Sequence, residues 1–277
     1  MLDNIDLDTN DVLGEDSEDS SVGGPVAHWL IGSESPYWGT PTLRDIVPKS
    51  SGRGGNHGTL TNGPIWQGSS GRPGGWGALR FVSASSQQVT LSSSALTASS
   101  AFTLVLWVRP DDTVTGRLLG KGIQGGGGFI EYGMSMRSGG TFRIDTNVGG
   151  SYTSVDTTTT YTTGLWYNLA GVFDGTNLYV YLNGQQNNSA GALGTITAYN
   201  DNVQIGGDTV FAEYASALLD DVQVFPNLAL SAAKVALLYD QSRRGYPDRR
   251  RRRKTYYVPS GAPPAAVRSD LLLLGVG

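Results

Sequence analysis

Short strand-like runs separated by turn residues recur through residues 26–225 at intervals of about ten residues, and this recurrence constrains the fold most strongly. The clearest run is 101–109, AFTLVLWVR, in which apolar residues alternate from Phe102 to Val108. A period of two places such residues on one face of a strand. Pro110 follows, and because proline lacks the N–H that a further ladder bond needs, we expect the strand to stop before it.

Other runs of the same kind predict further strands, at 26–31, 78–82, 88–91, 129–136, 141–145, 151–156, 165–173, 178–182, 202–205 and 218–225. The dipeptide Asn183-Gly184 follows one of them and predicts a hairpin with a two-residue primed turn. Glycine supplies 39 of the 277 residues, about twice its usual share of roughly 7%, as a chain with many turns requires.

A single helix is predicted near the end of this region, in SAAKVALLYDQ, residues 231–241. Ser231 suits the N-cap, and Val235, Leu238 and Tyr239 recur at helical spacing. The pattern as a whole predicts an all-β, two-sheet antiparallel sandwich with one short C-terminal helix.

Charge divides the chain into three parts. Residues 1–24 form an acidic N-terminal arm with few large apolar groups, residues 25–247 form the predicted domain, and residues 248–277 form a basic, proline-containing arm. The basic run consists of Arg249, Arg250, Arg251, Arg252, Arg253 and Lys254. We therefore expect extended charged termini on either side of one folded body.

Several classes of function are excluded or disfavoured by composition. The chain has no cysteine, which removes disulfides and thiolate chemistry. Residues 1–20 have no basic cluster and no apolar core, so no Sec-type signal peptide is expected. The apolar run 271–274 is far shorter than the roughly 20 residues of a membrane span, so no span is expected.

The stretch KSSGRGGNHGTL, residues 49–60, contains His57, one of only two histidines. Its glycine spacing does not match a dinucleotide-binding loop, and no helix pattern follows. The chain has no G-x-S-x-G elbow and no cysteine, so His57 has no nucleophile for a catalytic triad. Two histidines and no cysteine are also too few for a typical zinc site. The favoured interpretation is that His57 lies in a turn, where its imidazole caps backbone groups or covers apolar surface.

Six motifs in order resemble the concanavalin A-like, laminin G-type jelly-roll superfamily over residues 25–243. They are GNHGTL, GWGALRF, AFTLVLWVRP, LWYNLAGVFDGTNLYVYLNG, IGG and LLDDVQVFPNLALS. The resemblance implies a β-sandwich of about a dozen strands with a short helix before the chain exit. Members are commonly carbohydrate- or protein-binding modules.

The resemblance also implies a structural calcium site, in which a looped turn joins a later aspartate. The positions that match are Asp45, Asn56, His57, Asp220 and Asp221, although Lys49 stands near the place of the expected leading acid. Calcium takes six to eight oxygen ligands, so the missing acid weakens the site. The alternative is a metal-free loop with Asp220 at a strand end.

Catalysis is not expected, although the superfamily includes glycosidases that resemble laminarinases. Glycoside hydrolysis normally needs two opposed carboxyl groups, and no predicted strand carries acids two or four residues apart. Sugar binding by aromatic stacking and polar groups is the alternative. Candidate aromatic residues on exposed turns are Trp38, Tyr132, Tyr152, Tyr161, Tyr199 and Tyr214.

The arms suggest assembly with other protein subunits, including further copies of this chain, through the basic run and the acidic head. Nucleic acid is a less favoured partner because the body is slightly acidic. The combination of binding fold, charged arms and no expected export signal predicts a non-catalytic structural or capsid-decoration protein of a phage virion. A free carbohydrate-binding module that recognises a cell-surface glycan, and a β-glucan-type glycosidase, are the alternatives; outside a particle the expected location is cytoplasmic.

Overall fold

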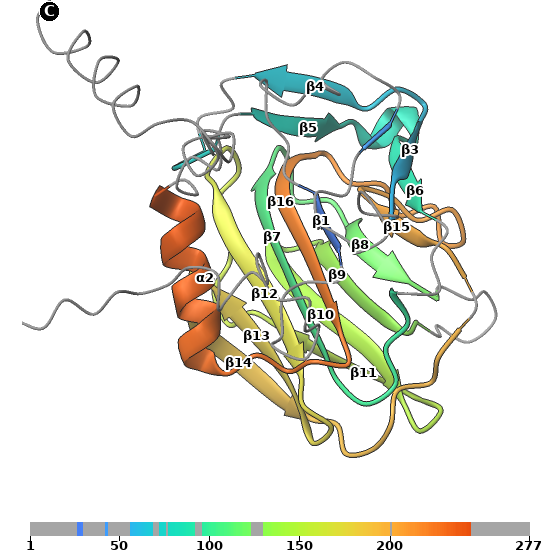
Figure 1. Ribbon diagram of the computed structural model, residues 1–277. Coiled ribbons are helices and arrows are strands. Elements are labelled where there is room, and N and C mark those ends of the chain that lie inside the picture. Colours follow the sequence, from blue (N-terminus) through green and yellow to red (C-terminus); the bar gives the residue numbers. More distant parts are fainter. Residues whose placement is uncertain are drawn as a thin grey trace, which may run out of the picture. The chain divides into compact units, whose positions relative to one another are not determined.

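The computed structural model describes residues 27–29, 42–43, 56–68, 72–75, 77–91, 96–122, 130–199 and 201–244 (Figure 1). The predicted acidic arm at 1–24 and basic arm at 248–277 lie outside the described residues, so the domain boundaries stay predictions. Among the described residues, no helix combines the length and the apolar character that crossing a membrane requires.

The first sheet has the strand order β14-β13-β12-β7-β16-β5-β4, and β1 also pairs with β16. Every pair is antiparallel. The bounds are β1 Ala27–Trp29, β4 Ile65–Gly68, β5 Gly77–Phe81, β7 Phe102–Pro110, β12 Tyr167–Phe173, β13 Asn177–Leu182, β14 Gln185–Gly191 and β16 Ala217–Pro226.

The second sheet has the order β11-β10-β9-β8-β15-β6-β3-β2 and is also antiparallel. The bounds are β2 Thr42–Leu43, β3 Gly58–Thr61, β6 Gln88–Leu91, β8 Gly116–Lys121, β9 Tyr132–Arg137, β10 Thr141–Val148, β11 Ser151–Asp156 and β15 Val203–Ile205. The predicted all-β, two-sheet antiparallel sandwich is therefore confirmed.

The core lies between the two sheets and follows from the alternation in their sequences. The inward residues of β7, from Phe102 to Val108, are fully buried, and Phe142 and Ile144 of β10 belong to the same cluster. Gly171 of β12 lets the sheets approach closely, because a Cβ there would lie 2.7 Å from Cγ2 of Ile144. Interleaved side chains of this kind give a sandwich its packed interior.

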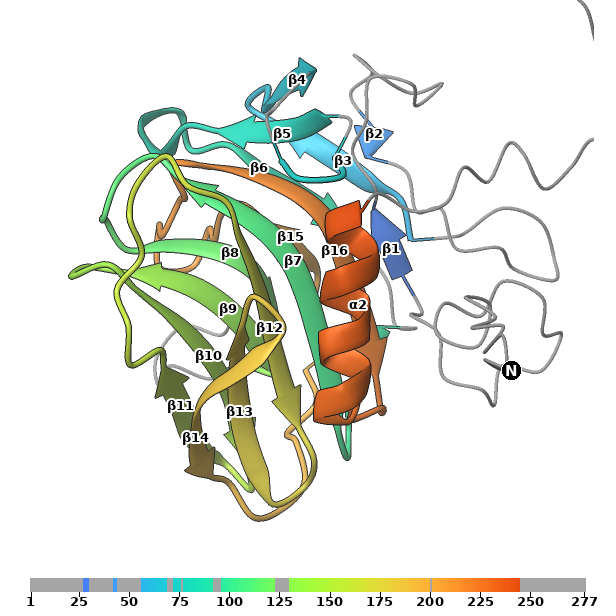
Figure 2. The same ribbon diagram turned by 90° about the vertical axis from the view of Figure 1, so that its left-hand side faces the viewer.

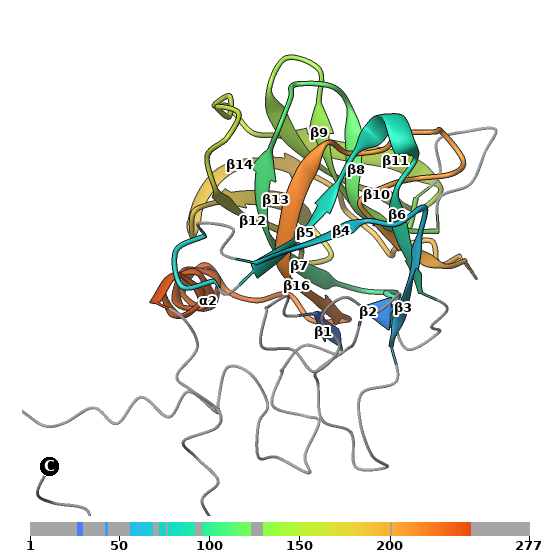
Figure 3. The same ribbon diagram turned by 90° about the horizontal axis from the view of Figure 1, so that it is seen from above.

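Helix α2, Ala232–Arg244, covers the outer face of the first sheet. Its Val235 and Leu238 are buried against Val105 of β7 and Ala170 of β12, the residues that alternate with the core positions. Figure 2 shows α2 running beside β7, β12 and β16, and Figure 3 places it on the opposite side of these strands from β8–β11. The predicted helix is confirmed, and Ser231 O accepts the first helical bond, from Val235 N at 3.0 Å.

Two local predictions have different outcomes. The hairpin turn is confirmed: Asn183 and Gly184 have φ values of 51° and 77°, and Leu182 pairs with Gln185. The predicted stop before Pro110 is wrong by one residue, since Pro110 ends β7 and pairs with Ala217. Proline lacks the N–H donor but keeps its carbonyl, and the carbonyl of Pro110 accepts a bond from Gly164 N. Pro110 can therefore occupy the last position of the strand, where no further N–H bond has to be made.

Candidate functional site

The outer face of the second sheet carries charged side chains on β8–β11, which we call the charged face. Alternation places them there: Met134 and Met136 of β9 point into the core, so Ser135 and Arg137 point outward. On β10, Phe142 and Ile144 belong to the core in the same way. The outward residues of β10 and β11 are Arg143, Asp145, Asn147, Tyr152, Ser154 and Asp156.

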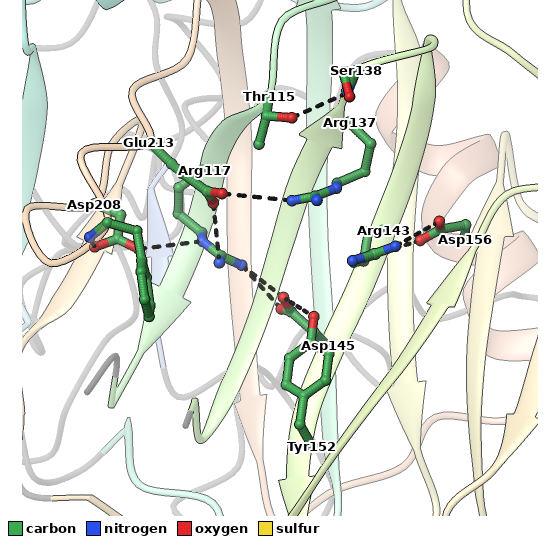
Figure 4. A network of polar contacts seen from close by, with 11 residues as sticks. Thr115, Arg117, Arg137, Ser138, Arg143, Asp145, Tyr152, Asp156, Asp208 and Glu213 are labelled. Carbon is green, nitrogen blue, oxygen red and sulfur yellow. Dashed lines mark hydrogen bonds and ion pairs between the residues drawn. The ribbon is translucent and has the colours of Figure 1, made fainter. Parts of the chain in front are cut away.

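Arg117 of β8 is the centre of this face (Figure 4). Its Nη1 donates to both carboxylate oxygens of Asp145, at 3.0 and 3.1 Å. Its Nη2 lies 3.5 Å from Glu213 Oε2, and its Nε lies 3.9 Å from Asp208 Oδ2. Burial alone would lower the pKa of Arg117, but the charges of Asp145 and Glu213 outweigh it and the pKa is raised.

Gly133 makes room for the central ion pair. A Cβ at this position would lie 2.3 Å from Oδ1 of Asp145 and 2.6 Å from Nη1 of Arg117. The missing side chain therefore lets the guanidinium cross β9 to reach the carboxylate on β10. We infer that glycine is required here for the geometry of the pair rather than for backbone freedom.

Tyr152 borders the same pair from β11. Its hydroxyl donates to Oδ2 of Asp145 at 3.2 Å, while 44% of the residue is exposed. Burial of the hydroxyl end raises the pKa of Tyr152, and the Asp145 charge adds to the rise. Beside it, Arg143 donates to both oxygens of Asp156, at 2.6 and 2.9 Å. An exposed aromatic ring thus lies among fixed polar groups.

A loop between β15 and β16 borders the other side of the charged face. Oδ1 of Asp208 accepts the backbone N–H groups of Val210 and Phe211, at 2.7 and 3.2 Å. Both of these side chains are 44% exposed. Glu213 of the same loop contacts Arg117 and also Arg137, whose Nη1 lies 3.6 Å from Oε1. The loop therefore brings two acids to the charged face, and it also carries the exposed Phe211.

Three acids around one arginine raise the question of catalysis, because sequence reasoning found no paired carboxylates. Asp145, Asp208 and Glu213 come from distant parts of the chain, so spacing along a strand carries no signal for them. Figure 4 shows Arg117 between Asp145 on one side and Asp208 and Glu213 on the other. The Arg117 guanidinium therefore contacts all three acids.

The predicted aromatic residues fall into different environments. The expectation of exposed turns is wrong for Tyr132, which is fully buried and donates to Leu96 O, and for Tyr161, which is 5% exposed. Tyr132 is an inward residue of β9, and the Tyr161 ring packs 4.6 Å from that of Phe142. Tyr152 is exposed on the charged face. Tyr199 and Tyr214 are half-buried, and Trp38 lies outside the described residues.

Tyr214 lies beside the charged face and Tyr199 follows a segment that borders it. Tyr214 forms an isolated bridge with Arg117 and packs against Gly207, where a Cβ would lie 2.5 Å from its ring. Thr197, two residues before Tyr199, donates to Oδ1 of Asn147 at 3.0 Å. Of the six predicted aromatic residues, Tyr152 is the described one that combines exposure with the polar centre.

Several described members of the predicted calcium set contact other groups of the protein. Oδ2 of Asp220 pairs with Arg72 Nε at 2.5 Å, and Oδ1 of Asp221 pairs with His28 Nε2 at 2.5 Å, all four side chains being buried. The carbonyl oxygen of Asn56 accepts a bond from the indole of Trp29.

His57 is half-buried just before β3. Among the described residues, no three of the His, Asp and Glu side chains form a grouping that could hold a metal ion. Asp45, the remaining member of the calcium set, lies outside the described residues, as do the predicted assembly residues 249–254. For both sets the prediction remains untested.

Solved structures similar to this chain include binding domains of botulinum neurotoxins and of a Paraclostridial mosquitocidal protein. The binding domain of Paraclostridial Mosquitocidal Protein 1 matches with a TM-score of 0.58 and 16% identity, over 78% of this chain and 52% of that one. The botulinum neurotoxin serotype G binding domain matches with 0.56 and 18%, over 78% and 50%. The serotype D ligand-binding domain, solved with N-acetylneuraminic acid, gives 0.55 and 14%, over 78% and 50%.

At these identities the likeness concerns the fold, and the chain spans about half the length of each toxin domain. No curated protein matches the chain in sequence. A family profile described as the concanavalin A-like lectin/glucanases superfamily matches residues 83–236, which is more than half of the 277 residues. The matched region includes β8–β11 and helix α2 up to residue 236. The chain is therefore a member of the concanavalin A-like lectin/glucanases superfamily.

Proposed function

We propose that this protein is a non-catalytic carbohydrate-binding protein and that the charged face of β8–β11 is its binding surface. The observation that carries the proposal is the exposed Tyr152 ring held against Asp145, Arg117 and Arg143. The similar toxin domains support the class, because their names describe them as binding domains and one was solved with a sugar.

The chemistry of the charged face suits a sugar. Aromatic rings stack on the apolar face of a pyranose, and fixed polar side chains bond its hydroxyl groups. Arg143 and Asp156 hold each other by two hydrogen bonds, so neither must be ordered when the ligand arrives. Such preorganisation lowers the entropic cost of binding. The acids contact arginines on the face itself, which favours binding over hydrolysis.

The charged arms give a finer version of this proposal. Opposite charges at residues 1–24 and 248–277 would let the domain attach to other subunits and display the charged face outward, as a virion decoration protein does. This version rests on the sequence. Sedimentation of the full chain and of a chain lacking both arms tests it: complexes that form only with the arms support attachment, and equal monomers contradict self-assembly.

Binding is tested on a glycan array with the full chain and with Tyr152→Ala. We expect the variant to lose most binding, since truncation of a central aromatic residue in a binding surface typically costs about 2 kcal/mol or more. Tyr179→Ala is the matched control, because Tyr179 also donates to an aspartate at 3.2 Å, Asp174, but lies on β13 of the first sheet. Equal binding by both variants would contradict the proposed surface.

The same array, run with calcium and with a chelator, tests the calcium prediction. Incubation of the bound glycans with the protein tests catalysis. If the wild type releases reducing ends and Asp145→Asn does not, the glycosidase alternative is supported and the binding proposal is contradicted.

A further inference from the structure

Three arginines from adjacent strands surround one serine on the charged face. Ser135 of β9 is paired directly with Arg117 on β8 and with Arg143 on β10, so the three side chains leave the sheet together. Arg137 lies two residues further along β9, on the same side. In Figure 4 the guanidinium groups of Arg117, Arg137 and Arg143 lie around a common area, with Asp145 beside them.

The donors of this area are not all used by the protein. Ser135 is fully buried, and its Oγ has no hydrogen-bond partner among the described residues. Within the same part of the chain, Arg137 makes only an ion pair, 3.6 Å from Glu213, and no side-chain hydrogen bond. A buried hydroxyl without a partner costs free energy, so its position beside an underused guanidinium calls for an explanation.

We infer that this area, the arginine–serine centre, binds the carboxylate of an acidic sugar. The inference rests on the proposed function, since it names the class of glycan that the charged face takes. A planar carboxylate accepts two parallel bonds from a guanidinium and a further bond from a hydroxyl. Ser135 has no exposed surface without a ligand, so the partly exposed Arg137 side chain must shift before a carboxylate can reach the hydroxyl. The hydroxyl groups of the same sugar reach Asp145, and Tyr152 stacks on the ring.

The nearby acids set how strong this preference is. The charged face carries three arginines, Arg117, Arg137 and Arg143, against four acids, namely Asp145, Asp156, Asp208 and Glu213. Three minus four leaves a formal charge of −1, so no long-range field draws an anion in. Selectivity therefore comes from short bonds at the arginine–serine centre, and it resists added salt better than a phosphate-type basic patch does.

The experiment compares oligosaccharides rich in uronic acid with the same oligosaccharides after their carboxyl groups are reduced to alcohols. Titration calorimetry with the full chain gives the two dissociation constants. We expect the acidic form to bind at least about tenfold more tightly, which corresponds to one good charge-assisted contact. Ser135→Ala and Arg137→Gln should each remove most of this difference.

Both variants are expected to fold. Ser135→Ala deletes a hydroxyl that has no partner in the described structure, and Arg137 is 29% exposed. Arg109→Gln is the control, because Arg109 is also 29% exposed in a loose pair, 3.9 Å from Asp111, but lies on β7. It should keep the full preference for the acidic glycan.

Equal affinity for the acidic and reduced glycans, with both lost in Tyr152→Ala, would overturn the acidic-sugar inference and leave the proposed function standing. No binding of either glycan, on this test and on the array, would contradict both. A preference that survives in Ser135→Ala and Arg137→Gln would place the carboxylate elsewhere and overturn the inference.

Discussion

The two outer faces of the sandwich are built in opposite ways. On the first sheet, Val105 and Trp107 of β7 face helix α2, and the Trp107 ring stacks on Tyr239 with centroids 5.7 Å apart. On the second sheet, the outward residues of β9 and β10 include arginine and aspartate. The helix covers an apolar face, whereas polar side chains that bond one another form the charged face.

This difference separates stability from recognition. Burial of apolar surface under a helix stabilises a fold by about 25 cal/mol per Å². An arrangement of buried ion pairs is often no more stable than well-packed apolar residues would be. The ion pairs of the charged face therefore contribute little to the free energy of unfolding compared with apolar packing, which is consistent with a binding role.

The largest effect is expected at the helix-covered face. Arg72 pairs with Asp220, donates to Ser242 O at 3.0 Å and lies over Trp107, so it ties α2 to β16. Arg72→Gln leaves a buried carboxylate without its cation and should lower the free energy of unfolding by about 3–5 kcal/mol.

Denaturant unfolding followed by tryptophan fluorescence measures this change. Arg80→Gln is the control, because Arg80 has a 43% exposed side chain and its pair with Asp111 should contribute about 0–1 kcal/mol. Equal losses in the two variants would contradict the anchoring role of Arg72.

The next effect concerns Gly133 on the charged face. Gly133→Ala places a methyl group where Arg117 meets Asp145, so stability should fall by about 1–3 kcal/mol and glycan binding should be lost. Gly191→Ala is the control, since a Cβ at Gly191 meets nothing within 4 Å. Unchanged glycan binding in Gly133→Ala would show that the Arg117–Asp145 pair is not needed for glycan binding.

A smaller effect is expected for the Tyr152 hydroxyl. Tyr152→Phe keeps the ring but removes the bond to Asp145, so binding should weaken by about 0.5–1.5 kcal/mol. Tyr179→Phe loses the equivalent bond to Asp174 on the first sheet and should bind normally. Loss of binding as complete as in Tyr152→Ala would show that the hydroxyl, rather than stacking, dominates.

The smallest effect is that of moderately alkaline pH. The pKa of Tyr152 is raised, so its hydroxyl keeps the proton that it donates to Asp145 beyond the usual tyrosine value of 10.0. Glycan affinity should stay constant from about pH 7 to about pH 10 and decline only above it. A decline centred below pH 10 would mean that Tyr152 ionises more easily than its surroundings indicate.

Most of the fold could be predicted from the period of two, and the exceptions have physical causes. β11 has the predicted bounds, 151–156, and β7 differs by one residue at each end. β14 has no strand pattern of its own, because QQNNSAG lacks the apolar alternation of a half-buried strand; only the predicted Asn-Gly hairpin indicates it, and β13 pairs with it in the structure. The Tyr132 environment could have been predicted, since Tyr132, Met134 and Met136 alternate on one face.

The charged face could be predicted only in part. Arg143, Asp145 and Asp156 each follow a core residue along their strand, so the period of two predicts that their side chains point outward. The contacts of Arg117 with Asp208 and Glu213 depend on strand order and on a loop that returns over β8, and no local pattern encodes either. Adjacent Asp220 and Asp221 matched a metal motif, but in the structure Asp220 pairs with buried Arg72 and Asp221 contacts buried His28, both from distant segments.

The central claim is that glycan binds on β8–β11 rather than elsewhere on the sandwich. Amide hydrogen exchange of the full chain, with and without a saturating acidic oligosaccharide, tests it directly. We predict added protection in β9, β10, β11 and residues 207–214, with no change in α2. Protection confined to α2 and the first sheet, with β9–β11 unchanged, would contradict the account.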